Sequence, residues 1–209
     1  MVEIITLDEK RPRVEKLHKA VKALEEGELI IYPTETVYGL GADAASDDAV
    51  SKVFEAKSRS LKDPISIAVD SLSMAYQVGK LQPEEEILIR KLLPGPITVL
   101  VEPRPFLANA LSSGTGKVGV RIPDEVVTRD LIGSFGGPIT STSANISGRS
   151  APVRTDEALE QLEDYVSVAI DVGESEVGLA STVVEIDGGG VNIIREGPVS
   201  RDEILKALK

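Results

Sequence analysis

The chain has 209 residues, of which 42% are hydrophobic, and a formal net charge of −11 at pH 7. This length and hydrophobic content suffice for one sizeable core. No linker, low-complexity tract or internal repeat is visible, so we expect one domain over residues 1–209 and no additional C-terminal domain. The absence of cysteine excludes disulfides, thiolate zinc sites and cysteine nucleophiles. The acidic charge argues against a surface built to hold nucleic acid, but it allows a local basic cleft.

The N-terminal segment lacks the basic region and apolar core of a signal peptide, and the longest apolar runs are only strand-sized. We therefore expect a soluble, cytoplasmic protein. The single histidine, His18, lies on the polar side of a helical pattern that Gly27 ends, and we interpret it as a solvated helix residue. This interpretation excludes Ser-His-Asp hydrolysis and multi-histidine metal sites.

Helix and strand patterns alternate along the chain. Helices are expected over residues 14–24, 84–93 and 155–162, after Asp47 and after Asp124. Strands are expected over residues 3–6, 28–32, 65–69, 97–101, 118–122, 138–141, 166–170, 182–186 and 191–194. The glycine-rich segment 187–190 is typical of a hairpin between the last two strands. Because crossovers and a hairpin occur together, we predict an α/β fold whose sheet mixes parallel and antiparallel strands.

The segment 29–41 is the most informative part of the sequence. A short apolar run indicates a buried strand, Pro33 ends it, and a polar loop follows. Thr34, Thr36 and Tyr38 place hydroxyl groups at alternate positions of that loop, which offers hydrogen-bond partners to a small polar substrate. An ordinary turn with incidental hydroxyls is the alternative.

Two glycine motifs resemble nucleotide-binding loops without meeting their requirements. Residues 39–44 fit G-x-G-x-x-A, but a polar segment separates the glycines from the preceding strand, which argues against a nicotinamide or flavin site. Residues 114–117 read Gly-Thr-Gly-Lys, but Val118 stands where a phosphate-binding loop needs Ser or Thr. We therefore exclude a Walker motif.

Cationic and hydroxyl side chains are spread over the ends of the predicted elements. Lys57 and Arg59 follow a predicted helix at alternate positions, and in an extended segment both would face one side and hold a polyphosphate. Solvated cations at a helix end are the alternative. Arg121 and Arg195 belong to apolar strands, where a buried arginine needs an anionic partner, either a ligand or a structural carboxylate. Residues 141–148 add hydrogen-bond donors for a small anion or a sugar.

Seven sequence blocks together carry a family resemblance. They are Tyr-Pro-Thr-Glu-Thr-Val-Tyr-Gly-Leu-Gly at 32–41, Lys-Ser-Arg at 57–59, Leu-Pro-Gly-Pro-Ile-Thr at 93–98, Val-Arg-Ile-Pro at 120–123, Ser-Ala-Asn-Ile-Ser-Gly at 143–148, Ser-Thr-Val-Val at 181–184 and Ile-Arg-Glu-Gly at 194–197. In this order they resemble the YrdC family of threonylcarbamoyl-AMP synthases over nearly the whole chain. Longer members add a C-terminal domain, and this chain, which stops one helix after Arg195, resembles the short form.

The resemblance implies a twisted mixed sheet with flanking helices and a deep central cavity. It implies a nucleotidyltransferase that forms threonylcarbamoyl-AMP and pyrophosphate from L-threonine, bicarbonate and ATP with Mg²⁺. The product serves threonylcarbamoyladenosine modification of tRNA through a downstream transferase. Weak binding of double-stranded RNA or tRNA in a basic cleft also follows, whereas no membrane and no protein-bound metal site are expected.

The resemblance also assigns roles to individual residues. The catalytic group corresponds to Lys57, Arg59, Ser143 and Asn145. The threonine pocket corresponds to Thr34, Arg121, Ser141 and Ser181. The ATP contacts correspond to Arg59, Lys117, Ser143 and Arg195. The expected reaction needs positioning and charge stabilisation rather than a protein nucleophile, which agrees with a chain without cysteine.

The chain departs from the family pattern at three positions. Ser60 replaces a frequent proline, Ala68 replaces a frequent histidine that contacts threonine, and Lys117 replaces a frequent threonine near ATP.

Three alternatives to this function remain. A YciO-like paralogue typically lacks the Ser143 and Asn145 pair, and the related hydrogenase-maturation carbamoyltransferases carry cysteine-rich zinc fingers. The third alternative is a non-catalytic RNA-binding module of the same fold, which a gel shift at a stated salt concentration would identify.

Overall fold

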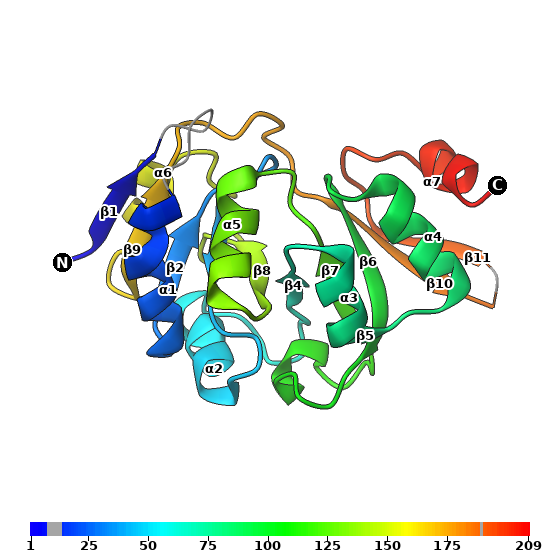
Figure 1. Cartoon of the computed structure of the whole chain (residues 1–209), viewed down its shortest axis with the longest axis horizontal. Coiled ribbons are helices and arrows are strands. Elements are labelled where there is room, and N and C mark those ends of the chain that lie inside the picture. The colour runs from blue at the N-terminus through cyan, green and yellow to red at the C-terminus, as the bar shows by residue number, and fades with distance from the viewer. Residues whose placement is uncertain (8–13, 189) are drawn as a thin grey trace.

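A single mixed sheet runs through the computed structural model, which describes residues 1–7, 14–188 and 190–209 (Figure 1). The strands are β1 (Glu3–Thr6), β2 (Leu29–Tyr32), β3 (Gly39–Gly41), β4 (Ser66–Ala68), β5 (Gly79–Lys80), β6 (Ile97–Pro103), β7 (Val118–Arg121), β8 (Ile139–Ser143), β9 (Val166–Asp171), β10 (Thr182–Asp187) and β11 (Gly190–Arg195). The helices are α1 (His18–Glu25), α2 (Asp47–Ala56), α3 (Leu72–Val78), α4 (Pro83–Leu92), α5 (Val126–Phe135), α6 (Thr155–Leu162) and α7 (Arg201–Ala207). Short 3-10 helices cover Val14–Leu17 and Asn109–Ser112.

The strand order is β1-β9-β2-β3-β8-β4-β7-β6-β10-β11, with β5 paired to β6. The pairs β1/β9, β9/β2, β4/β7 and β6/β10 are parallel. The remaining neighbours are antiparallel, including the β10/β11 hairpin that the glycine-rich turn predicts. The predicted single-domain α/β fold with a mixed sheet and flanking helices is therefore confirmed.

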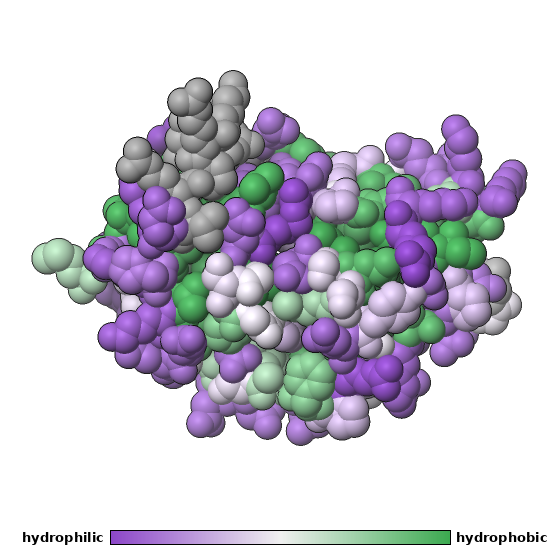
Figure 2. Space-filling view, in the orientation of Figure 1, coloured by the Kyte–Doolittle hydropathy of each residue, from purple (hydrophilic) through white to green (hydrophobic). Residues whose placement is uncertain are grey.

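Helices α1, α5, α3 and α4 lie across one face of the sheet, and α7 packs beside α4 (Figure 1). The apolar residues of the strands and of the inner helix faces form the core. The space-filling view of this helical face shows mostly hydrophilic side chains with apolar ones between them (Figure 2). None of the helices in the described part of the chain is long and apolar enough to cross a membrane.

Two predicted helix starts are shifted by one residue. Ser46, rather than Asp47, caps α2 by accepting a hydrogen bond from the backbone N–H of Ala49. Glu125, rather than Asp124, caps α5 in the same way. Each predicted cap is still a capping residue type, so the sequence signal marks the turn but not the single position that closes it. His18 is an exposed helix residue, as expected.

The loop expected after β2 contains a further strand, β3. Its glycines pair with β2 on one side and β8 on the other. Tyr32 explains why glycine is needed, since a Cβ on Gly39 would lie 2.5 Å from Cζ of the Tyr32 ring. Two further elements, α3 and β5, lie between predicted ones and were not predicted from the sequence.

Candidate active site

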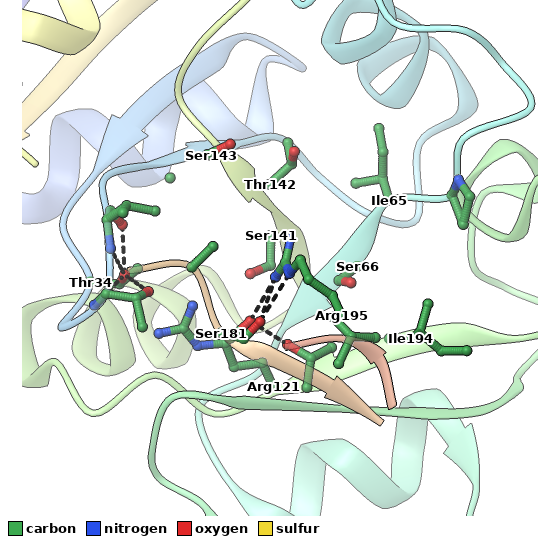
Figure 3. A pocket seen from close by; sticks show the side chains of 18 of the residues that line it. Thr34, Ile65, Ser66, Arg121, Ser141, Thr142, Ser143, Ser181, Ile194 and Arg195 are labelled. Carbon is green, nitrogen blue, oxygen red and sulfur yellow. Dashed lines mark hydrogen bonds between the residues drawn. The ribbon is translucent and has the colours of Figure 1, made fainter. Parts of the chain in front are cut away.

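A cavity of about 350 Å³ lies among the central strands and the loops at their ends. The view in Figure 3 shows side chains from the Thr34 loop, β4, β7, β8 and β11 meeting there. Its polar lining residues are Tyr32, Thr34, Thr36, Tyr38, Arg59, Asp63, Ser66, Thr98, Arg121, Ser141, Thr142, Ser143, Ser181 and Arg195. The central cavity implied by the family resemblance is therefore present.

The period-two alternation of β6 and β7 separates cavity from core. Thr98 on β6, with Gly119 and Arg121 on β7, lines the cavity, whereas Val99 and Val120 are fully buried core residues. Alternate residues of each strand therefore face the core and the cavity, and the cavity-facing ones include polar Thr98 and Arg121 as well as apolar Leu100. This alternation explains why an arginine stands in an otherwise apolar strand.

Three arginines converge on the cavity from different elements. Arg59 comes from the segment after α2, Arg121 from β7 and Arg195 from β11. Burial, followed by the nearby charges of Arg121 and Arg59, lowers the pKa of Arg195. Because like charges repel in a partly desolvated site, this arrangement favours an anion with several negative charges.

Arg195 is oriented by the start of β10. Its Nε and Nη2 donate to the backbone oxygen of Ser181 at 3.0 and 2.8 Å, and Nη2 also contacts Ser181 Oγ at 3.1 Å. Ser181 Oγ in turn lies 2.9 Å from Thr98 Oγ1 (Figure 3). The guanidinium therefore has a fixed direction, although it forms no ion pair with a carboxylate of the described residues.

Arg121 is held by a carboxylate that the sequence analysis did not assign to the site. Its Nη2 lies 2.7 Å from Oε2 of Glu35, and both side chains are more than nine-tenths buried. The pair is an ion pair without hydrogen-bond alignment, because Nε and Nη2 of Arg121 and both Glu35 oxygens lack a hydrogen-bond partner in the described residues. Arg121 therefore has the structural carboxylate that the sequence offered as an alternative to a ligand. Its guanidinium still has N–H donors without an acceptor among the described residues, and Arg121 lines the cavity.

The Thr34 loop is organised by its own hydroxyl. Thr34 Oγ1 donates to the backbone oxygen of Val37 at 2.6 Å and accepts the backbone N–H groups of Thr36 and Val37, each at 3.2 Å. Tyr38 Oη donates to the backbone oxygen of Gly173 at 2.6 Å. These bonds stiffen the loop, which is an ordered wall of the cavity rather than an ordinary turn.

Lys57 lies behind the cavity wall. Only 1% of it is exposed, and its ammonium donates to the backbone oxygen of Ser143 and to the backbone and side-chain oxygens of Asn145. Burial, followed by the charge of Arg59, lowers the pKa of Lys57 to about 7. Lys57 ends α2 in a helical conformation and Ser58 has φ 48°, so the segment is not extended and the two cations do not face one side as a simple pair.

Further hydrogen bonds hold the Ser143 and Asn145 side chains together. Ser143 Oγ donates to Oδ1 of Asn145, and Nδ2 of Asn145 donates to the backbone oxygens of Ile146 and Arg149. Ser143 lines the cavity, whereas Asn145 is buried behind it. Asn145 and Lys57 therefore support the part of the wall that carries the Ser143 hydroxyl.

Most predicted site residues meet at the cavity. Those on its lining are Thr34, Arg59, Arg121, Ser141, Ser143, Ser181 and Arg195. Lys117 lies elsewhere, because its ammonium is 3.4 Å from Glu185 and donates to the backbone oxygen of Ile186. Its assignment to ATP finds no support in this geometry. Ala68 is fully buried and outside the lining, so the threonine contact expected from a histidine there is absent.

Sequence reasoning also missed Ser66, Thr98 and Asp63, which line the cavity. Ser66 and Thr98 are single polar residues inside short apolar strands, and that pattern was the available signal. Asp63 follows Lys62 in a polar loop, where nothing in the sequence distinguishes it. Glu35 stands inside the Thr34 loop, where its acidity could have been matched to Arg121 only with the fold known.

A family model for Sua5, YciO and YrdC proteins, described as "Telomere recombination", matches residues 22–197. The chain belongs to this family. The resemblance carried by the seven sequence blocks is thereby confirmed. Within the family, relatives named threonylcarbamoyl-AMP synthase come from archaea, bacteria and mammals.

The family relatives differ in length. A threonylcarbamoyl-AMP synthase of Pyrococcus abyssi is 34% identical over 201 residues, which are 95% of this chain and 59% of that protein. A putative threonylcarbamoyl-AMP synthase of Mycobacterium tuberculosis is 35% identical over 209 residues, which are 100% of this chain and 96% of the relative. A crystal structure of P. abyssi Sua5 complexed with L-threonine superposes with a TM-score of 0.93 at 34% identity, covering 98% of this chain and 60% of that one.

Proposed function

We propose that this chain is a threonylcarbamoyl-AMP synthase, a nucleotidyltransferase that forms threonylcarbamoyl-AMP and pyrophosphate from L-threonine, bicarbonate and ATP. The observation that carries the proposal is the convergence of Arg59, Arg121 and Arg195 on one hydroxyl-lined cavity. This charge and polarity suit an amino acid together with a triphosphate. The names of the family relatives and the threonine complex of P. abyssi Sua5 support the same reaction.

The two kinds of anion have different places in the proposed site. Threonine lies near Thr34, Arg121, Ser141 and Ser181. There Arg121 takes the substrate carboxylate and the hydroxyls surround the side chain. ATP lies toward Arg59 and Arg195, whose guanidinium groups have no carboxylate partner among the described ion pairs. The threonine end is thus balanced by Glu35, and the ATP end keeps an excess of positive charge.

The proposed chemistry proceeds in two bond-forming steps. The threonine ammonium first loses a proton, and the free amine then attacks the carbon of bicarbonate or carbon dioxide to form a carbamate. Water leaves when bicarbonate reacts, and an N–H proton is released to solvent when carbon dioxide reacts. A carbamate oxygen then attacks the α-phosphorus of ATP, the α–β phosphoanhydride bond breaks, and pyrophosphate leaves. Arg59, Arg195 and the Ser143 hydroxyl stabilise the charge that develops on the phosphate oxygens. Lys57 and Asn145 complete the catalytic group by holding Ser143 in place.

Mg²⁺ enters this scheme with ATP. Asp63 is the carboxylate on the lining of the cavity, and no cluster of three metal-ligating residues occurs in the described part of the chain. Since Mg²⁺ in such sites is held by few carboxylates, waters and the substrate phosphates, the residues present fit an ion carried by the triphosphate. Bound there, Mg²⁺ would neutralise phosphate charge during the transfer.

The wider setting follows from the same proposal. The product would pass to a transferase that modifies tRNA in the cytoplasm, and the basic cavity entrance would give weak contact with double-stranded RNA or tRNA. A YciO-like or RNA-binding role without this activity is the alternative. Both alternatives predict no pyrophosphate release that depends on threonine.

The test is pyrophosphate release from ATP with Mg²⁺, in which threonine and bicarbonate are omitted in turn. We expect release only when both are present, because the carbamate must form before it attacks the α-phosphate. Release that is unchanged without bicarbonate would overturn the proposed reaction. Arg59→Ala is expected to lower the rate by about a hundredfold, as loss of a preorganised charge donor does. Arg59→Lys keeps the charge but loses the planar set of N–H donors, so its rate should lie between the rates of the unmodified protein and Arg59→Ala.

A further inference from the structure

Glu35 is a buried acid with one strong partner. Its carboxylate is 8% exposed and lies 2.7 Å from the Arg121 guanidinium. Its two oxygens have no aligned hydrogen bond in the described residues. A buried carboxylate is costly unless it is paired, so the Arg121 charge is what keeps Glu35 stable in this position.

Arg121 depends in turn on the charge of Glu35. Arg121 shares the cavity with Arg195, and the positive charge of Arg121 disfavours the charged form of Arg195. Without an acid beside it, Arg121 would be repelled from the other arginines and drawn toward solvent. Glu35 opposes this repulsion from the loop side of the cavity. It also influences Tyr32, whose pKa burial raises to about 12.

The backbone of Glu35 has a second, separate contact. Its carbonyl oxygen accepts the N–H of Val177 at 2.8 Å, which ties the Thr34 loop to the segment leading to Ser181. This bond does not involve the side chain. A side-chain substitution at position 35 therefore changes the charge beside Arg121 and leaves the connection between the two loops available.

We infer that Glu35 is a positioning residue whose charge holds the Arg121 guanidinium at the cavity and thereby sets the affinity of the site for the amino acid substrate. This inference rests on the proposed function. Glu35 does not touch the substrate in this scheme, since its oxygens are buried and Glu35 is not among the residues that line the cavity. Its charge makes the amino acid end of the cavity accept a monoanionic carboxylate while the other end accepts a polyphosphate.

Glu35→Gln tests the inference with little change of volume. We expect the KM for threonine to rise about tenfold or more, because Arg121 loses the counter-ion that holds it at the cavity, while the KM for ATP and kcat stay within about threefold. Threonine-induced thermal stabilisation, measured without ATP, should shrink in parallel. Glu35→Asp should recover part of the affinity. Glu28→Gln, which removes a surface pair with Lys52, is the matched control and should change neither quantity.

A double variant separates positioning from general damage. If Glu35 acts through Arg121, Glu35→Gln combined with Arg121→Gln should bind threonine no more weakly than Arg121→Gln alone. Three results would each overturn the inference. They are losses of threonine affinity that add in the double variant, an equal fall in kcat/KM for every substrate, and an unchanged threonine KM in Glu35→Gln. If Glu35→Gln does not fold, Glu35→Asp decides by the same KM comparison.

Failure of the proposed function has a different signature. If the unmodified protein releases no pyrophosphate with threonine and bicarbonate, the reaction is wrong whatever the variants do. The thermal-shift comparison of the unmodified protein and Glu35→Gln still reports on amino acid binding. An equal threonine shift in both, or no shift in the unmodified protein, contradicts the role of Glu35.

Discussion

Lys57 Nζ donates to the backbone oxygen of Asn145 at 2.7 Å, and the backbone oxygen of Lys57 accepts the N–H of Ser147 at 2.8 Å. The end of α2 is thus joined by both side chain and main chain to the loop that follows β8. This relationship gives Lys57 a structural part in the site as well as a charge. The Ser143 hydroxyl has its position on the cavity wall because this connection holds the loop.

We expect Lys57→Met to reduce both activity and stability. The substitution removes the Lys57 donor from three oxygen acceptors. Ser143 O and Asn145 Oδ1 keep another donor, but the buried backbone oxygen of Asn145 loses its bond to the ammonium, and such a loss typically costs about 1–3 kcal/mol of unfolding free energy. Pyrophosphate release should fall about a hundredfold, because the charge and the position of Ser143 are lost together. Urea denaturation and the pyrophosphate assay measure the two effects. Lys52→Met, which removes a surface ammonium paired with Glu28, is the control, and equal behaviour of the two variants would contradict the assignment.

The stability of the protein should depend on pH through Lys57. Burial lowers its pKa from 10.5 in the unfolded chain to about 7 in the folded protein. Between these values the unfolded chain binds more protons, so the unfolding free energy rises with pH from about 7 to 10.5. The rise is at most about 1.4 kcal/mol per pH unit. Below pH 7 both states are protonated, and the cost of burying the charge is fully present.

Urea denaturation at pH 7, 8 and 9 measures this dependence. The difference in unfolding free energy between the unmodified protein and Lys57→Met isolates the contribution of one ammonium, since all other groups are common to both. We expect the difference to shift in favour of the unmodified protein as the pH rises. A difference that stays constant over this range would show that Lys57 keeps its ordinary pKa.

The sequence predicted the elements and the charges of the site better than their contacts. Arg121 and Arg195 were identifiable because a charge inside an apolar strand is unusual. Their partners were not identifiable from the sequence. Glu35 meets Arg121 only when β2 and β7 come together in the sheet, and Ser181 meets Arg195 only when β10 pairs with β11. The strand β3 was missed for a related reason. Its glycines read as a turn, whereas the Tyr32 ring of the adjacent strand requires them.

Lys117 shows the opposite limit. It stands where the family often has a threonine near ATP, which suggested a ligand contact, but its ammonium lies 3.4 Å from Glu185 on β10. Side-chain direction depends on the strand pairing, which a motif does not encode. The family pattern therefore named residues that line the cavity, such as Arg121 and Ser181, whereas the ATP role of Lys117 stays a prediction. The alternation of Thr98 and Val99 would have indicated which face of β6 meets the cavity.

Gly119→Ala should obstruct the cavity. A Cβ at this position would lie 2.4 Å from Ser66 Oγ and 2.7 Å from Thr98 Cγ2, so neighbouring side chains must move. Such overpacking typically costs about 1–3 kcal/mol. We expect the KM for threonine to rise by about tenfold as the cavity floor shifts.

Gly133→Ala is the matched control, because this glycine lies in α5 outside the cavity lining. Its added Cβ would lie 3.3 Å from Oδ2 of Asp70, at the end of a side chain that can shift by a few tenths of an ångström. Alanine favours the helix by roughly 0.5–1 kcal/mol, so this variant should melt no lower than the unmodified protein and keep its kinetics. Thermal unfolding and threonine kinetics of both variants provide the measurement. A normal KM in Gly119→Ala would place threonine away from β7.

If the proposed reaction holds, the hydroxyl groups of the cavity should make the protein prefer threonine to valine, which has the same shape without a hydroxyl. When valine replaces threonine, a hydroxyl such as that of Ser181 has no substrate hydroxyl to bond. The loss of this hydrogen bond typically costs about 1–3 kcal/mol of binding free energy. The ratio of kcat/KM for threonine to that for valine is therefore expected to be about ten or more. Serine should be accepted better than valine, because the buried Ala68 supplies no polar contact that would favour the threonine side chain.

Ser181→Ala tests this selectivity directly. It removes the hydroxyl but keeps the backbone oxygen that orients Arg195, so we expect the threonine-to-valine ratio to fall while the KM for ATP changes less than about threefold. Ser167→Ala, on β9 outside the cavity lining, is the control for loss of one partly buried hydroxyl. If Ser181→Ala and Ser167→Ala leave the ratio equally unchanged, the threonine hydroxyl does not meet Ser181. The amino acid would then have to lie farther along the wall, toward Thr34 and Ser141.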